Sequence, residues 1–186
     1  MRWPVFALFA YLVLVLEVSL RNVLMLGPVG PSFVALLVVF VSLFAPRLTA
    51  LWACWVLGLL VDLCSPLMHG ADHVGPLLGA HALGYVFGCY VILQMRAMLF
   101  RRRAVTFAVM TAISLLAAGL VVVFLLAVHR LYPGEGLALR PLRELLLRLG
   151  VAGYSGVLAL LLGPVLVWTA PMWGFRGGPQ RHAGWR

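Results

Sequence analysis

Six long apolar segments divide the chain, and short breaks containing proline, glycine or arginine separate them. A helix needs about 20 apolar residues to cross the core of a bilayer. The segments predict membrane helices over residues 3–20, 29–45, 48–64, 76–95, 104–129 and 145–170. The fifth is the clearest, because residues 104–128 contain no charged side chain. The pattern therefore predicts an all-α fold, a polytopic membrane helix bundle with six transmembrane helices.

The second and third segments are short, and only Pro46 and Arg47 separate them. We expect each of them to cross the membrane, and a re-entrant hairpin is the alternative that hydropathy leaves open. Residues 1–170 are expected to form a single integral membrane domain. Residues 171–186 are rich in arginine, glycine and tryptophan and are expected to form a flexible cytoplasmic tail.

The arginines predict the orientation of this domain. All 14 basic residues are arginine, and a cytoplasmic N-terminus assigns nine of them to the inner side and five to the outer side. Arginine is enriched in cytoplasmic loops, so both termini are expected in the cytoplasm. All five acidic residues then lie on the outer side or at outer helix ends: Glu17, Asp62, Asp72, Glu135 and Glu144.

Composition narrows the class of protein further. Apolar residues make up 64% of the chain and charged residues only 10%, against about a quarter in soluble domains. Soluble folds, coiled coils and nucleic-acid-binding modules are therefore excluded. The net charge of +9 points to anionic phospholipid rather than nucleic acid as the partner of the basic side chains. The strongest basic cluster is expected to anchor lipid phosphates or to dock an acidic cytoplasmic partner; it comprises Arg96, Arg101, Arg102 and Arg103.

Small residues recur at helical spacing in three of the predicted helices. Such stripes allow close approach of helix backbones in lipid. They can serve packing inside the bundle or docking of a partner's membrane helix, and both alternatives stay open. The stripes are Ala50, Cys54, Gly58 and Asp62; Ala80, Gly84 and Gly88; and Ala152, Gly156, Ala159 and Gly163.

Two acidic positions within the predicted helices require partners. Asp62 ends a small-residue stripe, so it should face protein rather than lipid, with Arg21, Arg130 or Arg143 as a possible partner. Glu17 and Arg21 stand four residues apart in the order that favours an ion pair along a helix. We expect this pair to stabilise the end of the first helix.

The sequence gives little support for catalysis or for a cofactor. Histidines and one aspartate gather on the predicted outer side, but Gly70 and nearby prolines indicate a loop rather than a helical ligand face, so a metal site is not favoured. No nucleophile, paired-carboxylate or phosphate-loop motif is visible. The outer group comprises His69, Asp72, His73, His81 and His129.

The order of these features resembles the MreD family of bacterial rod shape-determining membrane proteins over most of residues 1–170. An acid, Glu17, lies near the end of the first helix, and Pro31-Ser32-Phe33 opens the second. Pro164 lies within the last helix. The most specific piece is Gly58-xxx-Asp62 followed by Gly84-Tyr85.

This resemblance implies a non-enzymatic scaffold of the cell-wall elongation complex, located in the bacterial cytoplasmic (inner) membrane. Its partners would be the single-span protein MreC, MreB filaments, a membrane glycosyltransferase and a penicillin-binding protein. Gly58, Asp62, Gly84 and Tyr85 would be structural or interface residues.

The fold it implies is similar to the substrate-binding subunit of energy-coupling-factor transporters. That likeness gives the alternative function, vitamin binding in an outer pocket near Asp62, His69 and His81. An enzyme acting on lipid-linked substrates through the outer histidines is a third alternative.

Overall fold

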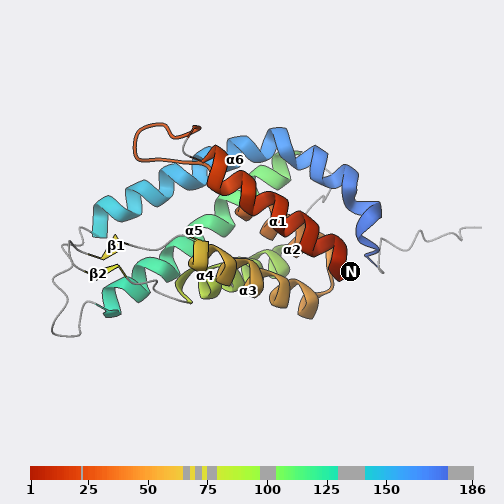
Figure 1. Ribbon diagram of the computed structural model, residues 1–186, viewed down its shortest axis with the longest axis horizontal. Coiled ribbons are helices and arrows are strands. Elements are labelled where there is room, and N and C mark those ends of the chain that lie inside the picture. Colours follow the sequence, from red (N-terminus) through yellow and green to blue (C-terminus); the bar gives the residue numbers. More distant parts are fainter. Residues whose placement is uncertain are drawn as a thin grey trace, which may run out of the picture.

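A computed structural model describes residues 1–21, 23–64, 68–69, 73–74, 79–96, 104–129 and 141–175 (Figure 1). Helices dominate these residues, and the two short strands β1 (Met68–His69) and β2 (His73–Val74) form one antiparallel pair. The helices are α1 (Trp3–Leu20), α2 (Phe33–Phe44), α3 (Arg47–Cys64), α4 (Ala80–Met95), α5 (Ala104–His129), α6 (Pro141–Thr169) and the 3₁₀ helix η1 (Ala170–Trp173). The protein is thus a helical membrane-type bundle, as the hydropathy pattern predicts.

Local chemistry explains where the helices depart from the predicted ranges. The predicted starts of α2 at residue 29 and α4 at residue 76 are wrong by four residues each. Ser32 caps α2, since its Oγ accepts a hydrogen bond from the backbone nitrogen of Ala35 at 3.3 Å. Gly79, with a φ of +103°, precedes α4. In the other direction, α6 begins at Pro141 rather than at residue 145, and proline is favoured at the first position of a helix.

Four helices are long and apolar enough to cross a membrane: α1, α3, α5 and α6. Helices α2 and α4 are shorter, at 12 and 16 residues. With a rise of 1.5 Å per residue, α2 is about 18 Å long, well short of the roughly 30 Å core of a bilayer. Length and composition therefore identify four membrane-spanning candidates among the described helices.

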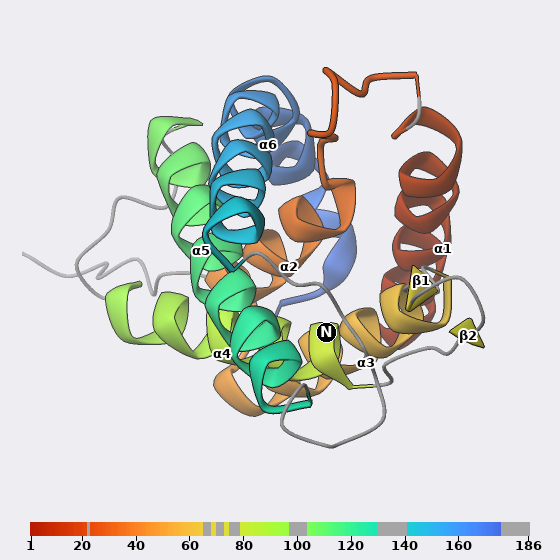
Figure 2. The ribbon, with the colours of Figure 1, turned by 90° about the vertical axis from the view of Figure 1, so that its left-hand side faces the viewer.

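Helix α2 lies at the centre of the bundle (Figure 2). Every residue from Phe33 to Leu43 is buried, and α2 packs against α1, α3, α4, α5 and α6. A helix that is apolar on all sides gains most from complete enclosure by other helices. Its short length suits this position, because its neighbours rather than lipid surround it.

Successive helices run in opposite directions. One end of the bundle, the Glu17–Asp62 end, brings Glu17 of α1 to the start of α2 and Asp62 of α3 to the start of α4. The opposite, terminal end joins the N-terminus to η1, because the backbone nitrogen of Arg2 donates to the carbonyl oxygen of Trp173 at 2.9 Å. The chain therefore passes up and down between two well-defined ends.

The terminal end is closed by a cluster of aromatic rings. Trp173 is fully buried, and its ring centroid lies 4.9 Å from that of Phe9 and 5.1 Å from that of Phe40. Packing with the bundle extends through η1 to Phe175, a few residues past the predicted domain boundary at residue 170. Residues 176–186, most of the predicted tail, lie outside the described part.

Candidate functional site

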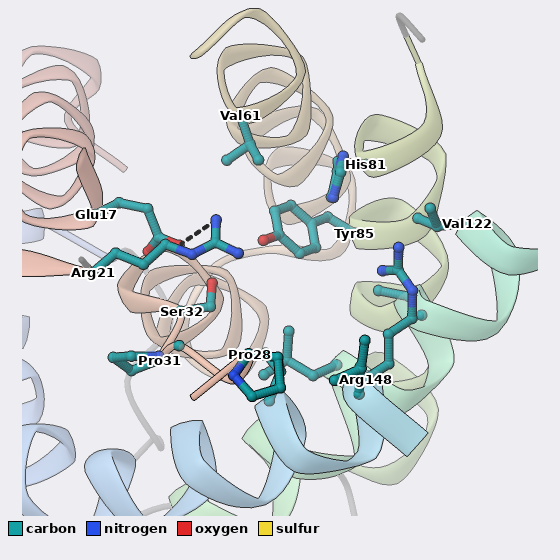
Figure 3. Close-up of a pocket in the computed structure, with 16 residues that line it drawn as sticks. Glu17, Arg21, Pro28, Pro31, Ser32, Val61, His81, Tyr85, Val122 and Arg148 are labelled. Atoms are coloured by element: carbon teal, nitrogen blue, oxygen red, sulfur yellow. Dashed lines mark ion pairs between the residues drawn. The ribbon is translucent and has the colours of Figure 1, made fainter. Parts of the chain in front are cut away.

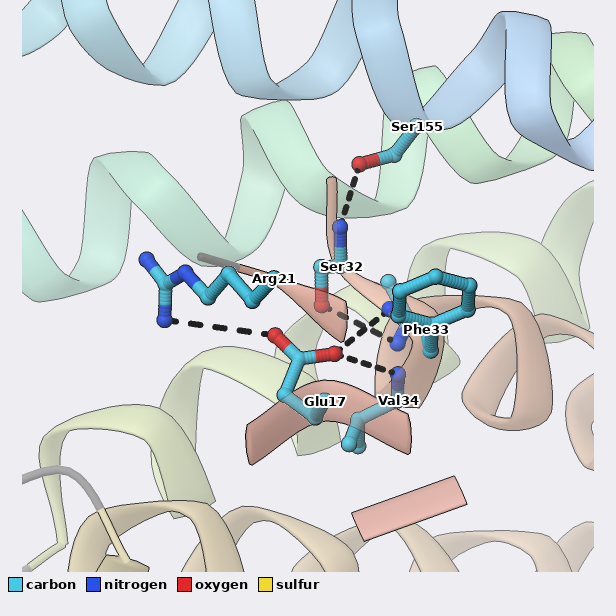
Figure 4. Close-up of polar contacts among 7 residues, drawn as sticks. Glu17, Arg21, Ser32, Phe33, Val34 and Ser155 are labelled. Carbon is cyan, nitrogen blue, oxygen red and sulfur yellow. Dashed lines mark hydrogen bonds and ion pairs between the residues drawn. The ribbon is translucent and has the colours of Figure 1, made fainter. Parts of the chain in front are cut away.

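The carboxylate of Glu17 connects α1 to the start of α2 (Figure 4). Its Oε2 accepts hydrogen bonds from the backbone nitrogens of Phe33 at 2.5 Å and Val34 at 3.2 Å. A helix N-terminus has unpaired N–H donors and a partial positive charge, so it suits a buried carboxylate. The backbone nitrogen of Ser32 donates to the Oγ of Ser155 at 2.9 Å, which ties the same segment to α6.

The ion pair predicted on α1 is present, with 3.9 Å between Nη1 of Arg21 and Oε1 of Glu17. The shorter contacts of Glu17 with α2 were missed by the sequence reasoning. Ser32 before an apolar run is a readable sign of a helix start. That this start would lie beside Glu17 depends on how α1 and α2 pack.

The carboxylate of Asp62 connects α3 to the start of α4 in the same way. It accepts from the backbone nitrogens of Gly79 at 2.9 Å, His81 at 3.1 Å and Ala82 at 3.3 Å. Nδ1 of the His81 ring lies 2.7 Å from Oδ1 of Asp62. Asp62 is only 3% exposed, so it faces protein as the sequence predicts.

The prediction that Arg21 is the partner of Asp62 is wrong, because Arg21 pairs with Glu17 instead. The histidine and the helix start take that place, because the α3–α4 hairpin folds them directly over the carboxylate. The side chains of Arg130 and Arg143, the other two candidates, lie outside the described part.

Glu17 and Asp62 thus form two acid clamps, which we define as a buried carboxylate of one helix bound to the first backbone N–H groups of the next. Backbone polar groups away from water must find partners within the protein. Each clamp satisfies a carboxylate and a helix start together, and both lie at the Glu17–Asp62 end.

The small-residue stripes lie between helices of this chain. A Cβ on Gly58 would stand 2.7 Å from the backbone nitrogen of Ala82, and one on Gly84 would stand 3.0 Å from the carbonyl oxygen of Ala118. Gly88 packs equally closely on Ser114. These faces are filled by α4 and α5, so a partner's helix has no access to them in this structure.

The other predicted site residues fall into three groups. Ala80 is buried and packs with Val122 of α5, and Tyr85 is 5% exposed. Nη1 of Arg96 donates to the carbonyl oxygen of Ala45 at 2.8 Å, at the end of α2. Arg101, Arg102 and Arg103 lie outside the described residues. Within the described part, no three histidine, cysteine or acidic residues come together as metal ligands.

A cavity of about 300 Å³ lies beside the two clamps (Figure 3). Polar side chains from the end of α1, the N-cap of α2, α4 and α6 line it together with apolar residues of α5. The polar lining comprises Glu17, Arg21, Ser32, His81, Tyr85 and Arg148.

The fold and these contacts define a multi-pass helical membrane protein whose acidic side chains join one helix to the next. The family model for MreD, described as rod shape-determining protein MreD, matches residues 1–132. The chain belongs to the MreD family, whose role is to determine rod shape. The matched region holds both acid clamps and ends before α6. Comparison with curated proteins and with solved structures finds no match.

Proposed function

We propose that this protein is a non-enzymatic scaffold of the cell-wall elongation complex. Membership of the MreD family carries this proposal, since the family determines cell shape and is associated with the MreBCD complex. The acid clamps agree with it, because Glu17 and Asp62 bind backbone groups of this chain. In this function the chain holds MreC in the membrane and so links MreB filaments to the glycosyltransferase and the penicillin-binding protein.

Co-purification from native membranes tests the scaffold function. We expect the tagged full chain to retain MreC, identified by mass spectrometry, and an unrelated multi-pass protein of the same tag and expression level to retain none. Recovery of a monodisperse, folded chain from cells that produce MreC, without MreC attached, would contradict the proposal.

We further propose that all six helices cross the inner membrane, with both termini in the cytoplasm. The alternation of helix direction supports six crossings, since Gly58 packs on Ala82, Gly84 on Ala118 and Gly156 near Ala108 in antiparallel order. The short α2 is enclosed by other helices, so it needs no full apolar length of its own.

Reporter fusions test this orientation. A green fluorescent protein fused after Arg186 should fluoresce, and alkaline phosphatase fused there should be inactive. The same reporters inserted after Val23, in the α1–α2 connection at the Glu17–Asp62 end, should give the opposite result. Active phosphatase at the C-terminus would reverse the proposed orientation.

A further inference from the structure

The connection between α1 and α2 is apolar along most of its length. Residues 23–31 consist only of valine, leucine, methionine, glycine and proline. Connections that lie in water are usually polar. Three side chains of this segment are nevertheless exposed on the protein: Val23 at 76%, Leu26 at 70% and Met25 at 42%. The scaffold function gives these side chains no role.

The contact of this connection with α6 fixes its level along the bundle. A Cβ on Gly150 would stand 3.0 Å from Cγ2 of Val29, so the two residues lie side by side. Gly150 is nine residues from the start of α6 at Pro141, or about 14 Å along the helix axis. It also lies inside Leu145–Trp173, the apolar stretch that can cross a membrane. The base of the connection is therefore level with the membrane-spanning part of α6.

The length of α2 leads to the same level. Arg47 follows α2 and is exposed, and arginine near a helix end lies at the membrane surface, so Phe44 at the end of α2 is close to that surface. From there the 12 residues of α2 extend about 18 Å, whereas the apolar core of a bilayer is roughly 30 Å thick. The start of α2 at Phe33 therefore lies within the apolar core, and the connection leads into it.

The connection extends sideways from the bundle rather than beyond its end. In Figure 1, the connection after α1 stops short of the left-hand ends of α5 and α6. In Figure 2, which looks along the bundle, it lies on the outside between α1 and α6. The exposed apolar side chains therefore lie at the perimeter of the bundle, where lipid surrounds a membrane protein.

The backbone of the connection is suited to lipid. Polar backbone groups in hydrocarbon have to be paired within the protein. The backbone nitrogens of Leu26 and Val29 each donate to the carbonyl oxygen of the other residue, at 2.9 and 3.3 Å. The backbone nitrogen of Ser32 donates to Oγ of Ser155 at 2.9 Å, and Pro28 has no N–H group. The turn thus pairs backbone groups internally while its apolar side chains stay exposed.

We propose that the α1–α2 connection is embedded in one leaflet of the bilayer, with Val23, Met25 and Leu26 in contact with phospholipid acyl chains. Transfer of their exposed surface from water to lipid is favourable. Lipid fits this surface better than a partner's helix does, because a turn lacks the regular ridges against which helices pack. The inference depends neither on MreC nor on the orientation of the chain, so it and the scaffold function can fail separately.

Spin labelling of the full chain in phosphatidylethanolamine–phosphatidylglycerol vesicles tests this placement. Leu26→Cys and Val23→Cys each receive a nitroxide in a Cys64→Ser background, because Cys64 is exposed whereas Cys54 and Cys89 are buried. Collisions of the nitroxide with oxygen, which concentrates in lipid, are compared with collisions with a water-soluble nickel chelate. Both labels should lose nearly all collisions with the chelate and keep those with oxygen.

Two further labelled positions serve as matched controls. Tyr11→Cys is the lipid-facing control, since that side chain is 66% exposed in the middle of α1, and Arg47→Cys is the control at the membrane surface. An oxygen preference at positions 23 and 26 equal to that of the Tyr11 position supports the proposal. Collisions with the chelate as frequent as at the Arg47 position overturn it.

Photocrosslinking in native membranes separates lipid from a protein partner. Leu26 is replaced by p-benzoylphenylalanine, which on irradiation attaches to neighbouring C–H groups. We expect phospholipid adducts, seen as a mass increase of the purified chain, and no loss of the chain into larger protein adducts. A protein crosslinked to position 26 as the main product would overturn the proposal, because a partner rather than lipid would then cover the connection.

Discussion

At the scale of single residues, the acidic side chains do more than their local sequence suggests. Each of the two described carboxylates binds backbone N–H groups 16 to 20 residues further along the chain. A carboxylate can accept several hydrogen bonds at once, so one side chain fixes the direction in which the next helix starts. This role accounts for an acid near the end of α1 and another near the end of α3.

Replacement of Asp62 tests the clamp between α3 and α4. Asp62→Ala removes the acceptor for three backbone nitrogens and the His81 ring, so we expect the free energy of unfolding to fall by about 3 kcal/mol. His81→Ala should cost less, because the backbone contacts with Asp62 remain. Thermal unfolding in detergent measures both. Equal destabilisation by the two variants would show that the histidine, rather than the start of α4, is the main partner.

At the scale of helices, the close contact between neighbouring helix backbones depends on glycines, whose side chains lack even a methyl group. Gly58 meets the backbone of α4 and Gly84 that of α5, whereas Gly153 of α6 has open space where a Cβ would lie. Spacing four residues apart is common in apolar sequence, so the pattern identifies candidate contacts but not their partners. In the structure, the partners that contact these glycines are neighbouring helices of the same chain.

A pair of matched substitutions tests this packing. Gly58→Ala places a methyl group against the backbone of Ala82, which cannot move aside as a flexible side chain would. We expect a loss of about 1–3 kcal/mol in the free energy of unfolding, measured by thermal unfolding. Gly153→Ala should be neutral or slightly stabilising, since alanine favours helix. Similar effects at both positions would contradict close α3–α4 packing.

At the scale of the whole molecule, the two ends of the bundle differ in chemistry. The Glu17–Asp62 end carries the acid clamps and the cavity, whereas aromatic rings close the terminal end. The rings come from α1, α2 and η1, so the first and last described elements hold each other in place. Closure of the bundle therefore depends on residues beyond the region that the family model matches.

Tryptophan replacements test the closure of the terminal end. Trp173→Ala removes a fully buried ring and should cost about 3–5 kcal/mol in the free energy of unfolding. Trp168→Ala is the matched control, because that side chain is 85% exposed and should change the free energy by less than about 0.5 kcal/mol. The effect of both variants is measured as the fraction of purified protein that stays monodisperse after heating. If Trp173→Ala left the stability unchanged, η1 would not be needed to close the bundle.

The sequence by itself determined the helical membrane class, the ranges of α1 and α5, and the burial of Asp62. Hydropathy and charge are properties of consecutive residues, so a short stretch of sequence is enough to predict these features. The tertiary structure alone decided that α2 is central, that Glu17 and Asp62 bind helix starts, and that Arg21 and Arg148 face one cavity. These features join residues up to 127 positions apart, and only the packing of helices, which no local pattern encodes, brings them together.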